Sequence, residues 1–102
     1  MDLSQSLWAE KLSEDSNAVI LDVRTDYEHA EGYIPNAVQI DIMNGAKFID
    51  SAKELDSSKN YYVYCKSGGR SAQACMIMKS LGIETAYNLV GGFTNWQGEK
   101  TL

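Results

Sequence analysis

The sequence predicts an α/β domain built around a mostly parallel β-sheet. Two observations lead to this prediction. Short runs of apolar, β-branched and aromatic residues alternate along the chain with stretches in which apolar residues recur at helical spacing. A helical or turn segment separates each of these runs from the next, and strands that are joined in this way pair in parallel.

The N-terminal part is expected to hold one helix, one strand and one helical turn. Asp2 and Ser4 are candidate N-caps for a helix that extends to about Leu12, because polar caps precede residues with apolar periodicity. The run AVILDV at residues 18–23 is short, apolar and rich in β-branched residues, which is typical of a buried strand. One turn of helix is expected at residues 27–30.

The rest of the chain continues the alternation. Residues 38–42 are the second expected strand, and residues 47–55, with apolar side chains at helical spacing, are the next helix. The aromatic run YYVY at residues 61–64 predicts the third strand. A helix is expected at residues 71–81, before a glycine, and the last strand at residues 85–89.

Length and composition restrict the class of protein. With 102 residues, 44% of them hydrophobic and 23% charged, the chain is expected to form a single domain over residues 1–102. The net charge of −5 and the scattered basic residues argue against nucleic-acid binding. No signal sequence or membrane-spanning run is visible, and the two cysteines form no disulfide framework, so a cytoplasmic protein without membrane contact is expected.

The segment CKSGGRS, residues 65–71, is the strongest candidate for a functional site. It follows the strand YYVY and leads directly into a helix, and loops at the carboxyl ends of parallel strands form the binding crevice. Gly68 and Gly69 allow the backbone to curl so that N–H groups point inward, and the helix N-terminus adds partial positive charge. Both effects favour a thiolate at Cys65, and cysteines in such places have pKa values of about 3.5–7.5 instead of about 8.5.

A structural interpretation of the same segment is also available. A lone cysteine at the end of a strand is commonly a small buried hydrophobic residue, and glycines can serve only the turn. The full string of cysteine, lysine, serine, two glycines, arginine and serine between a strand and a helix favours the functional interpretation.

Four groups of residues, in order along nearly the whole chain, resemble the motifs of single-domain rhodaneses. They are residues 21–24 (LDVR), Glu28 with residues 31–37 (EGYIPNA), residues 65–71 (CKSGGRS), and residues 91–93 (GGF) with Trp96. The resemblance implies a rhodanese-like fold, in which helices flank a central parallel sheet on both faces. Tyr33 and Asn36 stand where the family usually has histidine and glycine, so that loop is expected to differ in detail.

The resemblance also implies a thiosulfate sulfurtransferase type of activity. Cys65 begins a six-residue active-site loop that ends at Arg70. It is the implied catalytic residue, which takes a sulfane sulfur from a donor such as thiosulfate or a persulfide and passes it to a thiophilic acceptor. The implied substrate-binding residues are Lys66, Ser67, Gly68, Gly69, Arg70 and Ser71.

In this mechanism the loop needs no metal and no cofactor. Its backbone N–H groups and the Ser67 and Ser71 hydroxyls hold the outer sulfur, while Lys66 and Arg70 attract a small anionic sulfur donor. The expected acceptor is a thiol or a cyanide-like molecule, and a sulfur-relay protein is a further expected partner.

The other chemically notable residues are interpreted as structural. Asp22 and Arg24 end a strand and are expected to form an ion pair or loop hydrogen bonds. His29 is the only histidine, and nothing in the sequence places it beside Cys65. Cys75 lies among apolar residues of a helix and is expected to pack in the core, although a role as resolving thiol stays open. Two aromatic residues, Phe93 and Trp96, are expected to cover the sheet.

Two other functions fit part of the pattern. Cysteine-type phosphatases have a related loop, but five residues separate their cysteine and arginine, whereas four separate Cys65 from Arg70. Tyr64 also stands where those enzymes have histidine. A non-catalytic rhodanese-like binding or regulatory module is the second alternative. Such modules often lack the cysteine, so the presence of Cys65 favours an enzyme.

Overall fold

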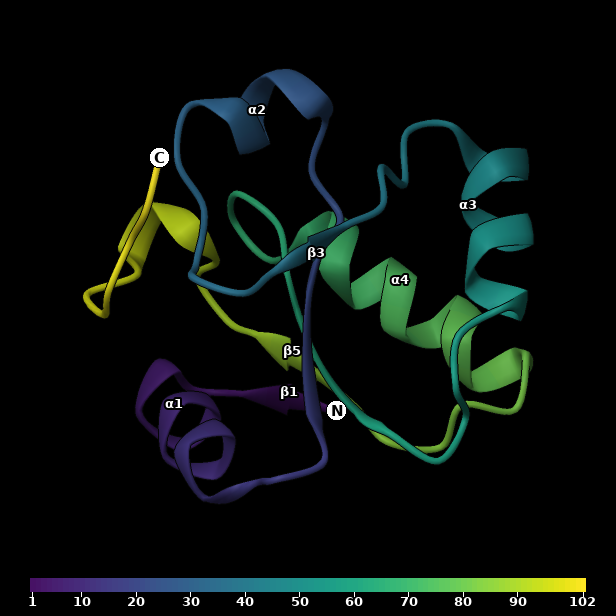
Figure 1. The fold of residues 1–102 in the computed structure, drawn as a ribbon, viewed down its shortest axis with the longest axis horizontal. Coiled ribbons are helices and arrows are strands. Elements are labelled where there is room, and N and C mark those ends of the chain that lie inside the picture. Colours follow the sequence, from purple (N-terminus) through teal and green to yellow (C-terminus); the bar gives the residue numbers. More distant parts are fainter.

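The computed structural model covers residues 1–102 and contains one five-stranded sheet in which all paired strands are parallel (Figure 1). The strands lie in the order β1-β5-β4-β2-β3. They are β1 (Asp2–Leu3), β2 (Ala18–Asp22), β3 (Val38–Gln39), β4 (Asn60–Tyr64) and β5 (Ala86–Leu89). The helices are α1 (Gln5–Glu14), α2 (Asp26–Ala30), α3 (Gly45–Lys53), α4 (Gly69–Ser80) and the short 3₁₀ helix η1 (Phe93–Asn95). The predicted α/β fold with a parallel sheet is therefore confirmed.

Helices cover both faces of the sheet, and a separate apolar core lies under each face (Figure 1). Side chains alternate between the faces along β4. Tyr62 and Tyr64 therefore join Trp8 of α1 in one core, whereas Val63 and Cys65 join the core beneath α3 and α4. Cys65 is thus held on the face that α4 covers.

Three element bounds differ from the sequence prediction in ways that affect the site. Asp2 lies in β1, a two-residue strand too short to leave a pattern, so Ser4 alone caps α1. β3 ends at Gln39 instead of residue 42, because only two of its residues pair with β2. α4 begins at Gly69, two residues earlier than expected, with Gly68 at φ 110° as its N-cap.

The parallel strands bring the loops at their carboxyl ends to one edge of the sheet. At this edge the segment after β5 supports the loop after β4: the Phe93 N–H donates to the Cys65 carbonyl at 2.8 Å, and the Thr94 N–H to the Lys66 carbonyl at 3.0 Å. Helix α2 follows β2 at the same edge. None of the helices combines the length and the apolar character needed to cross a membrane.

Candidate active site

Cys65 follows β4 directly, and its sulfur acts as the N-cap acceptor of α4. The Sγ atom accepts a hydrogen bond from the Gly68 N–H at 3.0 Å and one from the Ser71 hydroxyl at 3.3 Å. Gly68, the N-cap residue, has no side chain that could accept from the first helical turn. The sulfur therefore satisfies donors that a helix N-terminus otherwise leaves without a partner.

The hydrogen bonds to this sulfur lower the pKa of the thiol. Burial raises the pKa of Cys65, but hydrogen bonds from the Ser71 hydroxyl and from the N–H groups of Ser71, Gly68 and Ser67 outweigh it, so the pKa lies below its ordinary value. These donors stabilise the thiolate, which is the nucleophilic form of cysteine.

Gly92 follows β5 and lets the backbone come close enough for Phe93 and Thr94 to donate hydrogen bonds to the Cys65 and Lys66 carbonyls. Its backbone has φ +59°, and a Cβ atom there would lie 2.5 Å from the Lys66 carbonyl oxygen and 2.7 Å from that of Cys65. Only glycine permits so close an approach of two backbone segments. In the sequence Gly92 is notable only as part of a motif that resembles the rhodaneses, and the structure gives it a positioning role.

Asn88 on β5 lies behind Ser71 and was not noticed in the sequence. The Ser71 hydroxyl has a single proton, and Asn88 Oδ1 competes with the Cys65 sulfur as its acceptor. Asn88 Nδ2 donates to Asp2 Oδ1 at 2.9 Å and to the Gly68 carbonyl at 3.2 Å. Asn88 is buried, so these bonds fix both the loop and the Ser71 side chain. A polar residue inside the strand AYNL was the available signal.

Arg70 lies in the first turn of α4 and is bound by a carboxylate. Its Nη1 and Nη2 atoms donate to Glu28 Oε1 and Oε2 at 2.7 and 2.9 Å. Hydrogen bonds from Arg70 and then from Thr25 lower the pKa of Glu28 to about 2, so this carboxyl is ionised at neutral pH. The sequence predicts that Arg70 attracts a donor, but it gives no sign that Glu28 is the partner of Arg70.

The remaining loop residues lie toward solvent. Lys66, Ser67 and Gly69 are exposed. A hollow of about 210 Å³ lies beside the loop, lined by Arg24, Glu28, Glu31, Gly32, Lys66, Phe93 and Thr94. The loop is therefore reachable from outside, while the sulfur itself is covered.

Comparison with known proteins matches residues 6–99 to the rhodanese-like domain. The chain belongs to the rhodanese-like family. It is 36% identical over 98 residues to the putative sulfurtransferase YtwF of Bacillus subtilis, covering 96% of this chain and 91% of the relative. It is 33% identical over 98 residues to the putative sulfur carrier protein YrkF of the same organism, covering 96% of this chain but 51% of that protein.

A solved rhodanese-like structure has the same fold. The crystal structure of a rhodanese-like domain protein from Staphylococcus aureus matches with a TM-score of 0.80 and 35% identity, covering 96% of this chain and 92% of that one. The rhodanese-like fold that the motifs implied is therefore confirmed.

The first rhodanese-like motif, LDVR, forms a buried ion pair. Asp22 Oδ1 accepts from Arg24 Nε at 2.9 Å and Oδ2 from Arg24 Nη2 at 2.8 Å, and Tyr64 and His29 also bind Oδ2. Arg24 donates further to the Gly32 carbonyl at 2.6 Å. The predicted ion pair between Asp22 and Arg24 is confirmed, and His29 belongs to the same network.

The two departures from the family pattern have local explanations. Tyr33 stacks on His29 with ring centroids 4.1 Å apart, so both rings are fixed against the ion pair. Asn36 has φ 72°, in the left-handed region where glycine is favoured and asparagine is among the better-tolerated alternatives. The loop therefore keeps its backbone shape without the glycine.

The second thiol and the C-terminal aromatic residues are part of the cores. Cys75 belongs to α4 and is buried on the face that packs against the sheet, and burial raises its pKa to about 11. Both cysteines are free. Trp96 packs edge-on against Trp8 at 5.4 Å, and Phe93 lies 4.3 Å from the Arg24 guanidinium. The packing roles predicted for Cys75 and Trp96 are confirmed.

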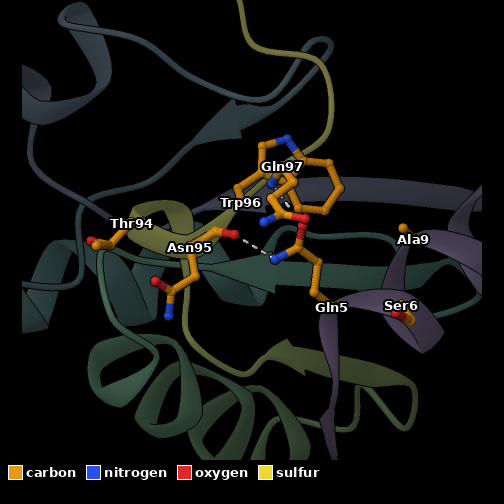
Figure 2. Close-up of a pocket in the computed structure, with 7 residues that line it drawn as sticks. All are labelled: Gln5, Ser6, Ala9, Thr94, Asn95, Trp96 and Gln97. Atoms are coloured by element: carbon orange, nitrogen blue, oxygen red, sulfur yellow. Dashed lines mark hydrogen bonds between the residues drawn. The ribbon is translucent and has the colours of Figure 1, made fainter.

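A wider hollow, of about 700 Å³, lies between α1 and residues 94–97 and differs from the site in its chemistry (Figure 2). The Gln5 amide donates to the Asn95 carbonyl at 2.6 Å and accepts from the Gln97 N–H at 2.7 Å (Figure 2). No titratable side chain lines it. No group of three histidine, cysteine, aspartate or glutamate side chains that could hold a metal ion occurs in the chain.

Proposed function

We propose that this protein is a sulfurtransferase that carries a sulfane sulfur on Cys65 as a persulfide. The observation that supports this most strongly is the set of donors around Cys65 Sγ, which includes the Gly68 N–H and the Ser71 hydroxyl. They stabilise an anionic sulfur at the end of a strand and the start of a helix. The names of the relatives, sulfurtransferase and sulfur carrier, agree with this function.

In the first step the Cys65 thiolate attacks the outer sulfur of the donor. A new S–S bond forms to Cys65, the S–S bond within the donor breaks, and the leaving group departs with that electron pair. From thiosulfate the leaving group is sulfite, and from a persulfide it is a thiolate. The sum of charges is the same before and after, and no external oxidant or reductant is needed.

In the second step a thiophilic acceptor attacks the outer sulfur of the Cys65 persulfide. The bond to Cys65 breaks, and the electron pair returns to Cys65 as the thiolate. Between the two steps the exposed residues of the loop, Lys66, Ser67 and Gly69, offer N–H groups to the anionic outer sulfur. The Ser67 hydroxyl is a further donor to it, while the Ser71 hydroxyl faces the inner sulfur, Cys65 Sγ.

The acceptor is a thiol, a cyanide-like molecule or a cysteine of a sulfur-relay protein. The relative named a sulfur carrier supports a relay. We place this chemistry in the cytoplasm, because both cysteines are free and thiols stay reduced in that compartment.

Intact-mass measurement tests the proposal. After incubation with thiosulfate or cysteine persulfide and removal of excess donor, the protein should gain the mass of one sulfur atom, and cyanide should remove it. Cys65→Ser should gain none, because a hydroxyl cannot store sulfane sulfur, whereas Cys75→Ser should behave as the parent.

Absence of any gain with both donors would contradict the proposal and favour a binding or regulatory module. A gain that persisted in Cys65→Ser and disappeared in Cys75→Ser would transfer the role to the other thiol. Circular dichroism of each variant establishes that it is folded.

A further inference from the structure

The charged groups beside the catalytic loop largely cancel one another. Arg24 lines the hollow there but is bound to Asp22 through two nitrogens. Arg70 is bound to Glu28 through both Nη atoms. Lys66 makes no ion pair, and neither does Lys100, whose Nζ atom lies 5.1 Å from the centre of the Phe93 ring.

More carboxylates surround this position. Glu31 lines the same hollow as Lys66. The hydrogen bonds that Arg70 donates to Glu28 raise the pKa of Arg70 most, and Asp41 is close enough to add a smaller effect in the same direction. Asp41 and Asp26 line a neighbouring hollow together with one cation, Lys47. The chain as a whole has a net charge of −5. An approaching dianion therefore meets no excess of positive charge.

Glu28 is held in place independently of Arg70. It is the third residue of α2, and its Oε1 atom accepts hydrogen bonds from the Thr25 N–H and the Thr25 hydroxyl, each at 3.1 Å. The Thr25 side chain in turn accepts from the Glu28 N–H at 3.3 Å, which completes a capping box. A donor that needs the Arg70 guanidinium must displace a carboxylate that the helix start keeps in position.

We propose that Glu28 is a specificity-determining residue, which holds Arg70 and thereby disfavours dianionic donors such as thiosulfate relative to a persulfide of low charge. This inference rests on the sulfurtransferase function proposed above. The persulfide delivers its outer sulfur to the Cys65 thiolate, and a thiolate leaves with the electrons of the broken S–S bond. That donor needs less cationic assistance than thiosulfate, whose leaving group is the sulfite dianion.

The test is the ratio of kcat/KM for thiosulfate to kcat/KM for cysteine persulfide, measured in the parent and in Glu28→Gln. Glutamine at this position keeps the capping box, so α2 is expected to remain folded. The freed guanidinium adds one positive charge near a dianion, and the ratio should rise about tenfold, mainly through a lower KM for thiosulfate.

Two control variants separate this effect from a general change of charge. Asp26→Asn removes a carboxylate from the same helix that makes no ion pair with Arg70, and its ratio should stay within about twofold of the parent. In the double variant Glu28→Gln/Arg70→Gln the freed cation is absent, so the ratio should return to about the parent value.

An unchanged ratio in Glu28→Gln would overturn the proposal, as would an equal rise in Asp26→Asn. Either result leaves the sulfurtransferase function intact if Cys65 still gains sulfur in the mass measurement. A complete lack of sulfur on Cys65 with both donors would instead overturn the proposed function and this inference together.

Discussion

The two cysteines of this chain are both buried, yet their surroundings have opposite effects on their charge. Cys65 is 1% exposed and has a lowered pKa, whereas Cys75 is 7% exposed and has a pKa raised to about 11. Burial raises the pKa of both thiols. Hydrogen-bond donors, and not depth, therefore distinguish the thiol with the lowered pKa from the one with the raised pKa.

The position of each cysteine relative to α4 explains the difference. Cys65 precedes the helix, where the N–H groups of the first turn have no carbonyl partner and turn to the sulfur. Cys75 lies in the interior of the helix, where the ladder of backbone hydrogen bonds already uses the N–H groups. One helix thus activates a thiol at its start and leaves a second one protonated within it.

The largest loss of activity is expected when the support of the loop is disturbed at Gly92. In Gly92→Ala the new Cβ collides with the carbonyl oxygens of Lys66 and Cys65, so the loop must move. A displacement of about 1 Å near a reacting group costs about a hundredfold in rate, which is the expected loss in sulfur transfer.

Gly45→Ala is the control for this variant, because a Cβ at Gly45 meets no atom within 4 Å. Sulfur transfer should be unaffected there. Normal rates in a folded Gly92→Ala protein would mean that the donors at Cys65 do not depend on the support from residues 91–93.

A smaller loss is expected from Ser71→Ala, which removes one donor from the Cys65 sulfur and none from Cys75. A hydrogen bond to a charged group contributes about 1.5–3 kcal/mol, so alkylation of Cys65 and sulfur transfer at neutral pH should slow by about tenfold or more. The pH profile of alkylation should move to higher pH. Ser80→Ala, in the last turn of the same helix, should leave the profile where it is.

The smallest effect on sulfur transfer, within about twofold, is expected from Cys75→Ala. The main effect of this substitution is on the free energy of unfolding at high pH. The raised pKa means that native Cys75 keeps its proton where the unfolded chain loses it, so the stabilisation is complete below about pH 9 and is lost as the pH rises to about 11. Over that range the free energy of unfolding of the parent should fall by about 2–3 kcal/mol relative to Cys75→Ala.

Denaturant titrations of the parent and of Cys75→Ala at several pH values measure this difference. The tyrosines titrate in both proteins, so their contribution cancels in the comparison. A constant difference between pH 8 and 11 would contradict the raised pKa of the Cys75 thiol.

The fold could be predicted wherever a strand or helix was long enough to have a period. The strands at residues 18–22 and 60–64 agree with the expectation within one residue at each end. β1 could not be predicted, because its two residues, Asp2 and Leu3, are in a strand only through their pairing with Asn88 and Leu89. Pairing of this kind links the two ends of the chain and has no local signal.

The start of α4 was predicted two residues late for a related reason. Glycines disfavour a helix by propensity, yet Gly69 is its first residue because the sulfur of Cys65 replaces a capping side chain. The local sequence therefore predicts the loop, but it does not predict the first residue of α4.

The candidate site also has one part that could be predicted from the sequence and one part that could not. Residues 65–71 are contiguous, and their chemistry could be derived from a strand, two glycines and a helix start. Glu28, Asn88 and Gly92 come from three other segments and act on the loop through contacts with Arg70, Ser71 and Lys66. Only the folded chain brings them together, so the sequence could suggest them at most as members of motifs.

The central claim is that donors, and not burial, make Cys65 the nucleophile, and differential alkylation of the native protein tests it most directly. The two thiols are treated together with iodoacetamide between pH 5 and 9, and peptide mass spectrometry follows each one. We predict that Cys65 is modified with a midpoint below the ordinary thiol pKa, while Cys75 stays unmodified although it is the more exposed residue. Earlier modification of Cys75, or equal pH profiles for the two thiols, would contradict the claim.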